Sequence, residues 1–203
     1  MNYRAGIAVG LSTAGFAVAL GLRDVIDPWL STAISGLVGI ALSTWALGSR
    51  LRGLFAITWR GFATAAAIGV GMVAATHAAY RVTESVSPTV TDHVRVLYAT
   101  IAVGHARLPL VGLTLVVVVA EEMVWRAAAL ELFPRRQARF ASATVMLYAL
   151  PQALAGAWLL VAAALAVGSL FIAQRIITGR LTDSIVTHAV WSIAIFVVVP
   201  LGA

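Results

Sequence analysis

Residues 116–133 read VVVVAEEMVWRAAALELF, an apolar run that two adjacent carboxylates and an arginine interrupt. An ionisable side chain at the centre of a bilayer costs at least about 2.5 to 3.5 kcal/mol on insertion scales. Glu121, Glu122 and Arg126 must therefore face protein or a water-filled cavity. On a helix, Glu122 and Arg126 lie four residues apart and can pair, whereas Glu121 is turned by about 100° and reaches toward a different neighbour. One carboxylate is thus left over after pairing.

The composition is that of a membrane protein. Of the 203 residues, 61% are hydrophobic and 11% are charged, which is too apolar for a soluble domain. We predict an all-α fold, a polytopic transmembrane bundle of about seven helices that forms a single membrane domain over residues 1–203. The chain has no cysteine, which excludes disulfides, thiolate nucleophiles and cysteine-ligated metal clusters.

Seven apolar stretches recur along the chain, and several are near the length of about 20 residues that a spanning helix needs. They are Ala5 to Leu22, Leu30 to Gly48, Phe62 to Tyr80, Leu108 to Phe133, Phe140 to Gln152, Leu154 to Ile177 and Ile185 to Leu201. The first is expected to stay in the mature protein as a spanning helix. The fifth is short and contains Pro151, which predicts a buried, tilted or incompletely spanning helix, so six or eight spans are also possible.

The placement of charge predicts an orientation. All 14 basic residues are arginines, and the net charge is +6. Arginines gather at the connections that follow the second, fourth and sixth apolar stretches, namely Arg50, Arg52, Arg60, Arg135, Arg136, Arg139, Arg175 and Arg180. Together with Arg4 they mark the cytoplasmic side, which predicts an internal N-terminus and an external C-terminus in a bacterial-type cytoplasmic membrane. Such loops and anionic lipid account for the positive charge, so we expect no nucleic-acid partner.

Three polar groups fall on three late helices. Besides the glutamates, Tyr148 and Gln152 are spaced by four residues, and so are His188 and Ser192, which puts each pair on one helix face. If the helices converge, a carboxylate, an imidazole and hydrogen-bonding groups meet inside the membrane. Such a group could hydrolyse an amide, with the carboxylate as general base on water and His188 and Ser192 as donors to the oxyanion.

At these positions the sequence resembles the CPBP family, which contains the CAAX prenyl protease type 2 and bacteriocin-processing intramembrane proteins. EEMVWR (121–126) matches the family's EExxxR signature, and TGRLTDSIVTHAVWS (178–192) looks like its last motif, HxxxN. The resemblance extends from Leu108 to Val199. We therefore expect residues 1–106 to form accessory helices and residues 107–203 to form a CPBP-like catalytic core.

The resemblance implies a glutamate-dependent intramembrane endopeptidase. Glu121 matches the water-activating base, Glu122 and Arg126 match residues that orient the site, and His188 and Ser192 fall at the oxyanion positions. The implied substrate is the membrane-adjacent end of a membrane protein, a lipidated protein or a peptide.

Two departures from the family pattern leave other functions open. The middle motif, FxxxH, carries Tyr148 and Gln152 instead, and Ser192 replaces the asparagine of the last motif. Glutamine can bind water but cannot share its proton, and serine is a shorter donor than asparagine. An acyl or peptidyl transferase is one alternative. Another is a catalytically inactive binding or immunity protein, and a proton-coupled transporter is the weakest.

A metal-dependent mechanism is not favoured by these residues. Only His188 and the two glutamates remain of the usual ligands, and Gln152 is a poor zinc ligand. We expect neither a catalytic metal nor another cofactor.

Overall fold

The computed structural model describes residues 2–101, 106–133 and 136–202, and these ranges contain helices and no strand. The order of the elements is α1 (Tyr3–Gly21), α2 (Pro28–Leu47), α3 (Arg50–Leu54), α4 (Trp59–Val86), α5 (Pro88–Ile101), α6 (Arg107–Glu121), η1 (Glu122–Ala128), η2 (Leu130–Leu132), η3 (Ala138–Phe140), α7 (Ala141–Leu154), α8 (Trp158–Thr178), α9 (Leu181–Ile193) and η4 (Ala194–Val198). The predicted all-α bundle is confirmed.

Short polar side chains start several of the long helices. The Asp27 carboxylate accepts a hydrogen bond of 2.8 Å from the backbone N–H of Leu30, and Pro28 occupies the first helical position of α2. The Thr58 hydroxyl accepts from the N–H of Gly61 at the start of α4. Gly179 caps the end of α8, and its φ of +70° lies in the left-handed region that glycine adopts without strain.

Among the described residues, six helical segments are long and apolar enough to cross a membrane. They are Tyr3–Gly21, Pro28–Leu47, Trp59–Val86, Arg107–Leu132, Trp158–Thr178 and Leu181–Val198. The predicted fifth stretch forms α7, which has 14 residues and Pro151 inside it. Since a spanning helix needs about 20 residues, α7 is the short, packed helix among the seven apolar stretches.

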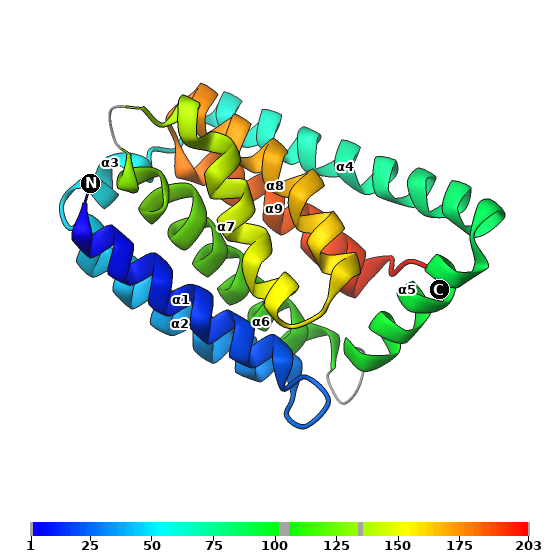
Figure 1. Ribbon diagram of the computed structural model, residues 1–203. Coiled ribbons are helices and arrows are strands. Elements are labelled where there is room, and N and C mark those ends of the chain that lie inside the picture. The colour runs from blue at the N-terminus through cyan, green and yellow to red at the C-terminus, as the bar shows by residue number, and fades with distance from the viewer. Residues whose placement is uncertain (1, 102–105, 134–135, 203) are drawn as a thin grey trace.

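Six helices form a closed ring. Each helix contacts the next in the order α1, α2, α6, α9, α8 and α7, and α7 returns to α1. Helix α4 packs on α9 at the outside of this ring, and α5 follows α4 at the end of the molecule that carries the C-terminus (Figure 1). The ring brings the early pair, α1 and α2, against the late helices that carry the polar groups.

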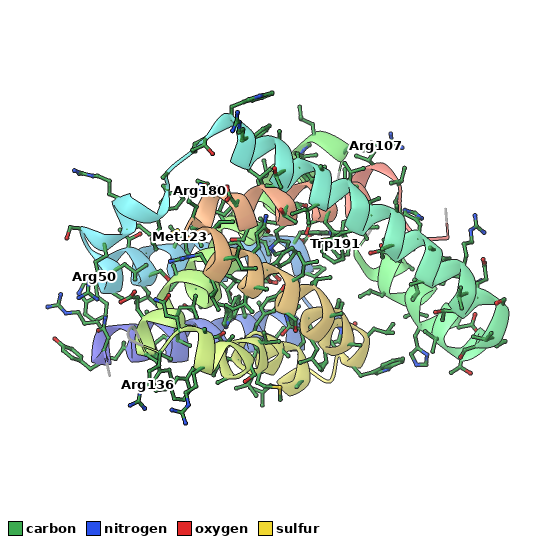
Figure 2. All side chains as sticks on the ribbon, turned by 90° about the horizontal axis from the view of Figure 1, so that it is seen from above. Arg50, Arg107, Met123, Arg136, Arg180 and Trp191 are labelled. Atoms are coloured by element: carbon green, nitrogen blue, oxygen red, sulfur yellow. The ribbon has the colours of Figure 1, made fainter. Side chains whose placement is uncertain are left out.

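The arginine-rich connections gather at one end of the bundle. Figure 2 shows Arg50 and Arg136 at one end and Arg107 toward the other. The N-terminus and α3 lie at the first of these ends in Figure 1. Arg135 lies outside the described residues. The arrangement is the one that the predicted orientation requires, and the side of the membrane that this end faces stays a prediction.

Candidate active site

The EEMVWR segment is π-helical from Glu122 onward, and Glu121 is the last residue of α6. Residues 122–128 form η1, and the N–H of Ala129 donates to the carbonyl of Val124, five residues earlier, at 2.8 Å. The sequence predicts an ordinary α-helix at Glu122 and Arg126, so this wider turn is a difference from the prediction. Short π-helical segments inside helices occur frequently at functional sites. All seven side chains of η1 are buried.

Glu122 and Arg126 form the predicted pair. Nη1 of Arg126 lies 3.5 Å from Oε1 of Glu122, and the two side chains are 1% and 0% exposed. The same carboxylate oxygen lies 2.9 Å from Nδ1 of His188, which donates to it when Glu122 is ionised. Glu122 therefore pairs within its own segment and also fixes the imidazole that α9 supplies.

Glu121 points to a different neighbour, as predicted. The hydroxyl of Tyr148 donates a hydrogen bond of 2.8 Å to Oε2 of Glu121. Nε2 of His188 lies 3.7 Å from the same oxygen. The imidazole is thus flanked by one carboxylate at each of its nitrogens, and it stacks on the ring of Phe171 with 4.4 Å between centroids.

A cavity of about 170 Å³ lies inside the six-helix ring. Five of the seven predicted site residues line it: Glu121, Tyr148, Gln152, His188 and Ser192. The cavity is otherwise lined mainly by apolar side chains. Since Glu122 and Arg126 are not among the lining residues, they lie behind the polar wall that the other five form.

Gln152 folds back on its own helix. Its carboxamide, oriented so that its nitrogen donates, bonds the backbone carbonyls of Tyr148 at 2.6 Å and Ala149 at 3.2 Å. Its side chain is 7% exposed and lines the cavity, as does Ser192, which is 3% exposed. The middle-motif position therefore borders the cavity, but its amide protons are directed to the backbone.

One comparison with known proteins finds a match, and it covers the helices that carry the predicted site residues. Residues 104–194 match the family model described as type II CAAX prenyl endopeptidase Rce1-like. Over these residues the chain is similar to the Rce1-like family. The expected CPBP resemblance is confirmed, the chain is an integral membrane protein, and the matched family is one of proteases. No curated protein and no solved structure matches the chain.

The Rce1-like segment begins just before α6 and ends in η4, so it contains all seven predicted site residues. It overlaps the predicted catalytic core, residues 107–203. The division into accessory helices and core stays a prediction. The cavity is lined by residues from both parts. Phe16 and Trp29, from α1 and α2, line the same cavity as Glu121.

Those early residues were not predicted as part of the site. Phe16, Trp29 and Thr32 belong to ordinary apolar helices, and nothing in their spacing distinguishes a cavity wall from packing or a lipid-facing surface. Thr114 of α6, seven residues before Glu121, lines the cavity as well. Two turns separate it from Glu121, so the helical period could have indicated it.

The donor set does not suit a metal ion. Within the described residues, no group of three histidine, aspartate or glutamate side chains is arranged to hold one. Both nitrogens of His188 face carboxylates, and the Gln152 amide is bonded to backbone. The Rce1-like segment therefore offers no built metal site among these residues, and the expectation of a metal-free reaction stays a prediction.

Proposed function

We propose that this protein is a glutamate-dependent intramembrane endopeptidase that cleaves the membrane-adjacent end of a protein or peptide. The observation that carries the proposal is the position of Glu121. Its carboxylate borders a mainly apolar cavity and lies beside the His188 imidazole, 3.7 Å from Nε2. A general base, a hydrogen-bonding imidazole and room for a substrate are what amide hydrolysis needs.

In the proposed reaction, Glu121 takes a proton from a water molecule, and the water oxygen attacks the scissile carbonyl carbon. A tetrahedral oxyanion forms. The C–N bond then breaks as the proton passes from Glu121 to the leaving nitrogen. The products are a carboxylic acid and an amine, so atoms and charge balance without a cofactor.

His188 and Ser192 are proposed as donors to the oxyanion. Both line the cavity on α9, four residues apart. Glu122 fixes the ring of His188 by accepting from Nδ1, which leaves Nε2 for the substrate side. The buried group of Glu121, Glu122, Arg126 and His188 is neutral when both glutamates are ionised and His188 is protonated. In that state Nε2–H is a donor, and no net charge is buried.

The apolar lining supports a substrate with a lipid-soluble part. The Rce1-like family is described as a prenyl endopeptidase family, and apolar side chains of α1, α2, α6, α8 and α9 line this cavity. We therefore propose a lipidated protein or peptide whose apolar group enters the six-helix ring. Its peptide bond would then lie beside Glu121.

Two other functions remain candidates, each for a specific reason. A transferase that passes an acyl or peptidyl group to an amine is favoured by Gln152, whose amide is bonded to backbone and cannot relay a proton from water. An inactive binding or immunity protein is favoured because both glutamates have hydrogen-bond partners, Tyr148 and His188. The cavity beside Glu121 is better explained by an enzyme.

Internally quenched peptides test the proposal. The purified full chain, in lipid nanodiscs, is incubated with peptides that end in a CAAX sequence, each with and without an S-farnesyl group on the cysteine. Mass spectrometry identifies the products. The proposal predicts cleavage next to the modified cysteine by the natural chain, and cleavage slower by about 100-fold or more by Glu121→Gln. An absence of cleavage for every peptide, with the protein folded, overturns it; a new amide formed with an added amine indicates the transferase.

A further inference from the structure

The Tyr148 hydroxyl is a buried group that the proposed reaction does not use. Tyr148 is 5% exposed, lines the cavity and donates to Oε2 of Glu121 at 2.8 Å. Building on the proposed function, we infer that Tyr148 is the positioning residue for Glu121. Its hydroxyl holds the base in the orientation for attack on water, a task that Gln152 does not perform.

The ring of Tyr148 is clamped from several sides. The guanidinium carbon of Arg126 lies 3.9 Å from the ring centroid, and the Trp125 ring packs at 5.1 Å between centroids. On the α8 side, a Cβ added to Gly168 would come within 2.7 Å of Cδ1 of Tyr148. Only a glycine allows α8 to approach this closely. These neighbours leave the phenol little freedom, so its hydroxyl is directed at Glu121.

Gln152 lies one turn further along α7 and borders the same cavity. Its amide nitrogen donates to the carbonyls of Tyr148 and Ala149. Turning it toward Glu121 would give up both bonds. Tyr148 needs no such change, because its hydroxyl already makes a short hydrogen bond of the kind that is strong when the acceptor is ionised.

Loss of the hydroxyl should loosen Glu121 without changing the cavity walls. Nε2 of His188 is 3.7 Å from the same oxygen, which is too long for a hydrogen bond. Tyr148→Phe therefore removes the contact that orients Oε2, while the aromatic ring still fills its place. Misplacement of a catalytic group lowers the rate of the chemical step, whereas binding of the apolar part of the substrate is unaffected.

The test is a double-mutant cycle of Tyr148→Phe and Glu121→Gln on the farnesylated quenched peptide. Tyr148→Phe should lower kcat by about 10- to 100-fold with KM nearly unchanged. In the Glu121→Gln background it should cause no further loss, because the base it positions is gone. Tyr80→Phe is the matched control, since Tyr80 is a buried tyrosine on α4 that does not line this cavity. It should keep kcat.

A rescue separates positioning from a merely structural role. Positions 148 and 152 both border the cavity, so an imidazole at 152 can offer a new N–H to Glu121. Gln152→His should therefore raise kcat by a larger factor in the Tyr148→Phe background than in the natural chain. The inference is overturned if Tyr148→Phe keeps the natural kcat. It is also overturned if the loss is equally large in the Glu121→Gln background.

Failure of the proposed function can be told apart from failure of the inference about Tyr148. If the natural chain cleaves none of the peptides, the enzyme proposal falls. The contact alone is then tested by the thermal unfolding midpoints, in detergent, of the natural chain, Tyr148→Phe, Glu121→Ala and their double variant, because alanine removes the acceptor that glutamine would keep. Coupled residues give a double variant whose loss of Tm is smaller than the sum of the two single losses. Additive losses overturn the inference that Tyr148 holds Glu121.

Discussion

The guanidinium of Arg126 lies over the ring of Tyr148, with its central carbon 3.9 Å from the ring centroid. Among the described residues, neither terminal nitrogen of Arg126 has a hydrogen-bond acceptor, although Nη1 is 3.5 Å from Glu122. The cation is therefore held by an ion pair on one side and by an aromatic face on the other. Arg126 supports both glutamates, because it pairs with Glu122 and packs on the residue that bonds Glu121.

The Glu122 and Arg126 pair should be needed for the fold. Removing one partner of a buried ion pair typically costs about 3 to 5 kcal/mol, because the other charge is left without compensation. Glu122→Gln should therefore lower the free energy of unfolding by about this much, together with the folded yield in detergent and any activity. The measurement is unfolding in mixed micelles, with yield followed by size-exclusion chromatography.

The exposed pair of Arg81 and Glu84 supplies the control for this prediction. These side chains are 79% and 43% exposed and lie 3.2 Å apart. Arg81→Gln should change the free energy of unfolding by no more than about 1 kcal/mol. Normal stability of Glu122→Gln with loss of activity alone would contradict a structural role and assign Glu122 to the chemistry.

Glu121→Gln should reduce activity but not stability, in contrast to Glu122→Gln. Glu121→Gln nearly preserves the shape of the side chain but removes the group that takes a proton, so activity should fall by about 100-fold or more. Expression and detergent stability should stay near those of the natural chain, because an amide can still accept from the Tyr148 hydroxyl. Cleavage of the quenched peptide by the variant at the natural rate would remove both enzyme proposals.

Much of the fold follows from hydrophobic periodicity and length. In a chain this apolar, the stretches must lie in lipid, where a helix pairs all the backbone N–H and C=O groups of a segment with one another. The all-α bundle was therefore predictable. The short fifth stretch was recognised from Pro151 and from its length, and α7 is indeed a packed helix of 14 residues. The predicted helix ends were less accurate. Helix α4 runs from Trp59 to Val86, beyond the predicted apolar run, because the polar residues after Tyr80 continue the helix.

The polar wall of the site was predictable because charge inside a membrane needs a partner. Glu121, Tyr148, Gln152, His188 and Ser192 share one cavity, as their helical spacing predicts. The π-helical turn at 122–128 was not predictable, since residue type and spacing are the same in an α-helix. The contribution of α1 and α2 was missed as well. Which apolar face borders a cavity depends on how the helices pack.

Gly168 should be required for the position of Tyr148. A methyl group there would come within 2.7 Å of Tyr148 Cδ1 and 3.3 Å of an Arg126 nitrogen, so α8 must shift outward. Overpacking of this kind typically costs about 1 to 3 kcal/mol. We expect Gly168→Ala to lower the free energy of unfolding by that amount and to reduce cleavage. Both are measured in the same detergent.

Gly71 is the matched control for this change. It lies inside α4, where a Cβ would meet nothing within 4 Å. Alanine is the better helix former by about 1 kcal/mol, so Gly71→Ala should be neutral or stabilising. Equal effects of the two substitutions would show that helix propensity, rather than the contact with Tyr148, decides the outcome.

Chelators should leave the activity unchanged. The proposed reaction needs only a carboxylate base and hydrogen-bond donors, and the described residues offer no three-ligand group for a metal ion. Dialysis against EDTA or 1,10-phenanthroline should therefore preserve the cleavage rate of the farnesylated peptide. A loss of activity that returns when zinc is added, but not in Glu121→Gln, would contradict this mechanism.

Gln152 offers the sharpest separation of hydrolase from transferase. Its amide lines the cavity beside Tyr148 but donates to backbone carbonyls, so it cannot share a proton with attacking water. An imidazole at this position can share one. If the natural chain is a weakened protease, Gln152→His should raise the rate of peptide hydrolysis, because a second basic group then assists Glu121. In a transferase the acceptor amine must compete with water, so the same change should increase hydrolysis at the expense of transfer.

Product ratios with an added amine acceptor, measured by mass spectrometry, distinguish the two. Gln152→Asn is the control, since it shortens the amide without adding a titrating group and should not increase hydrolysis. If Gln152→His changes neither product while Glu121→Gln abolishes both, position 152 takes no part in proton transfer, and Tyr148 and His188 are the groups that serve Glu121.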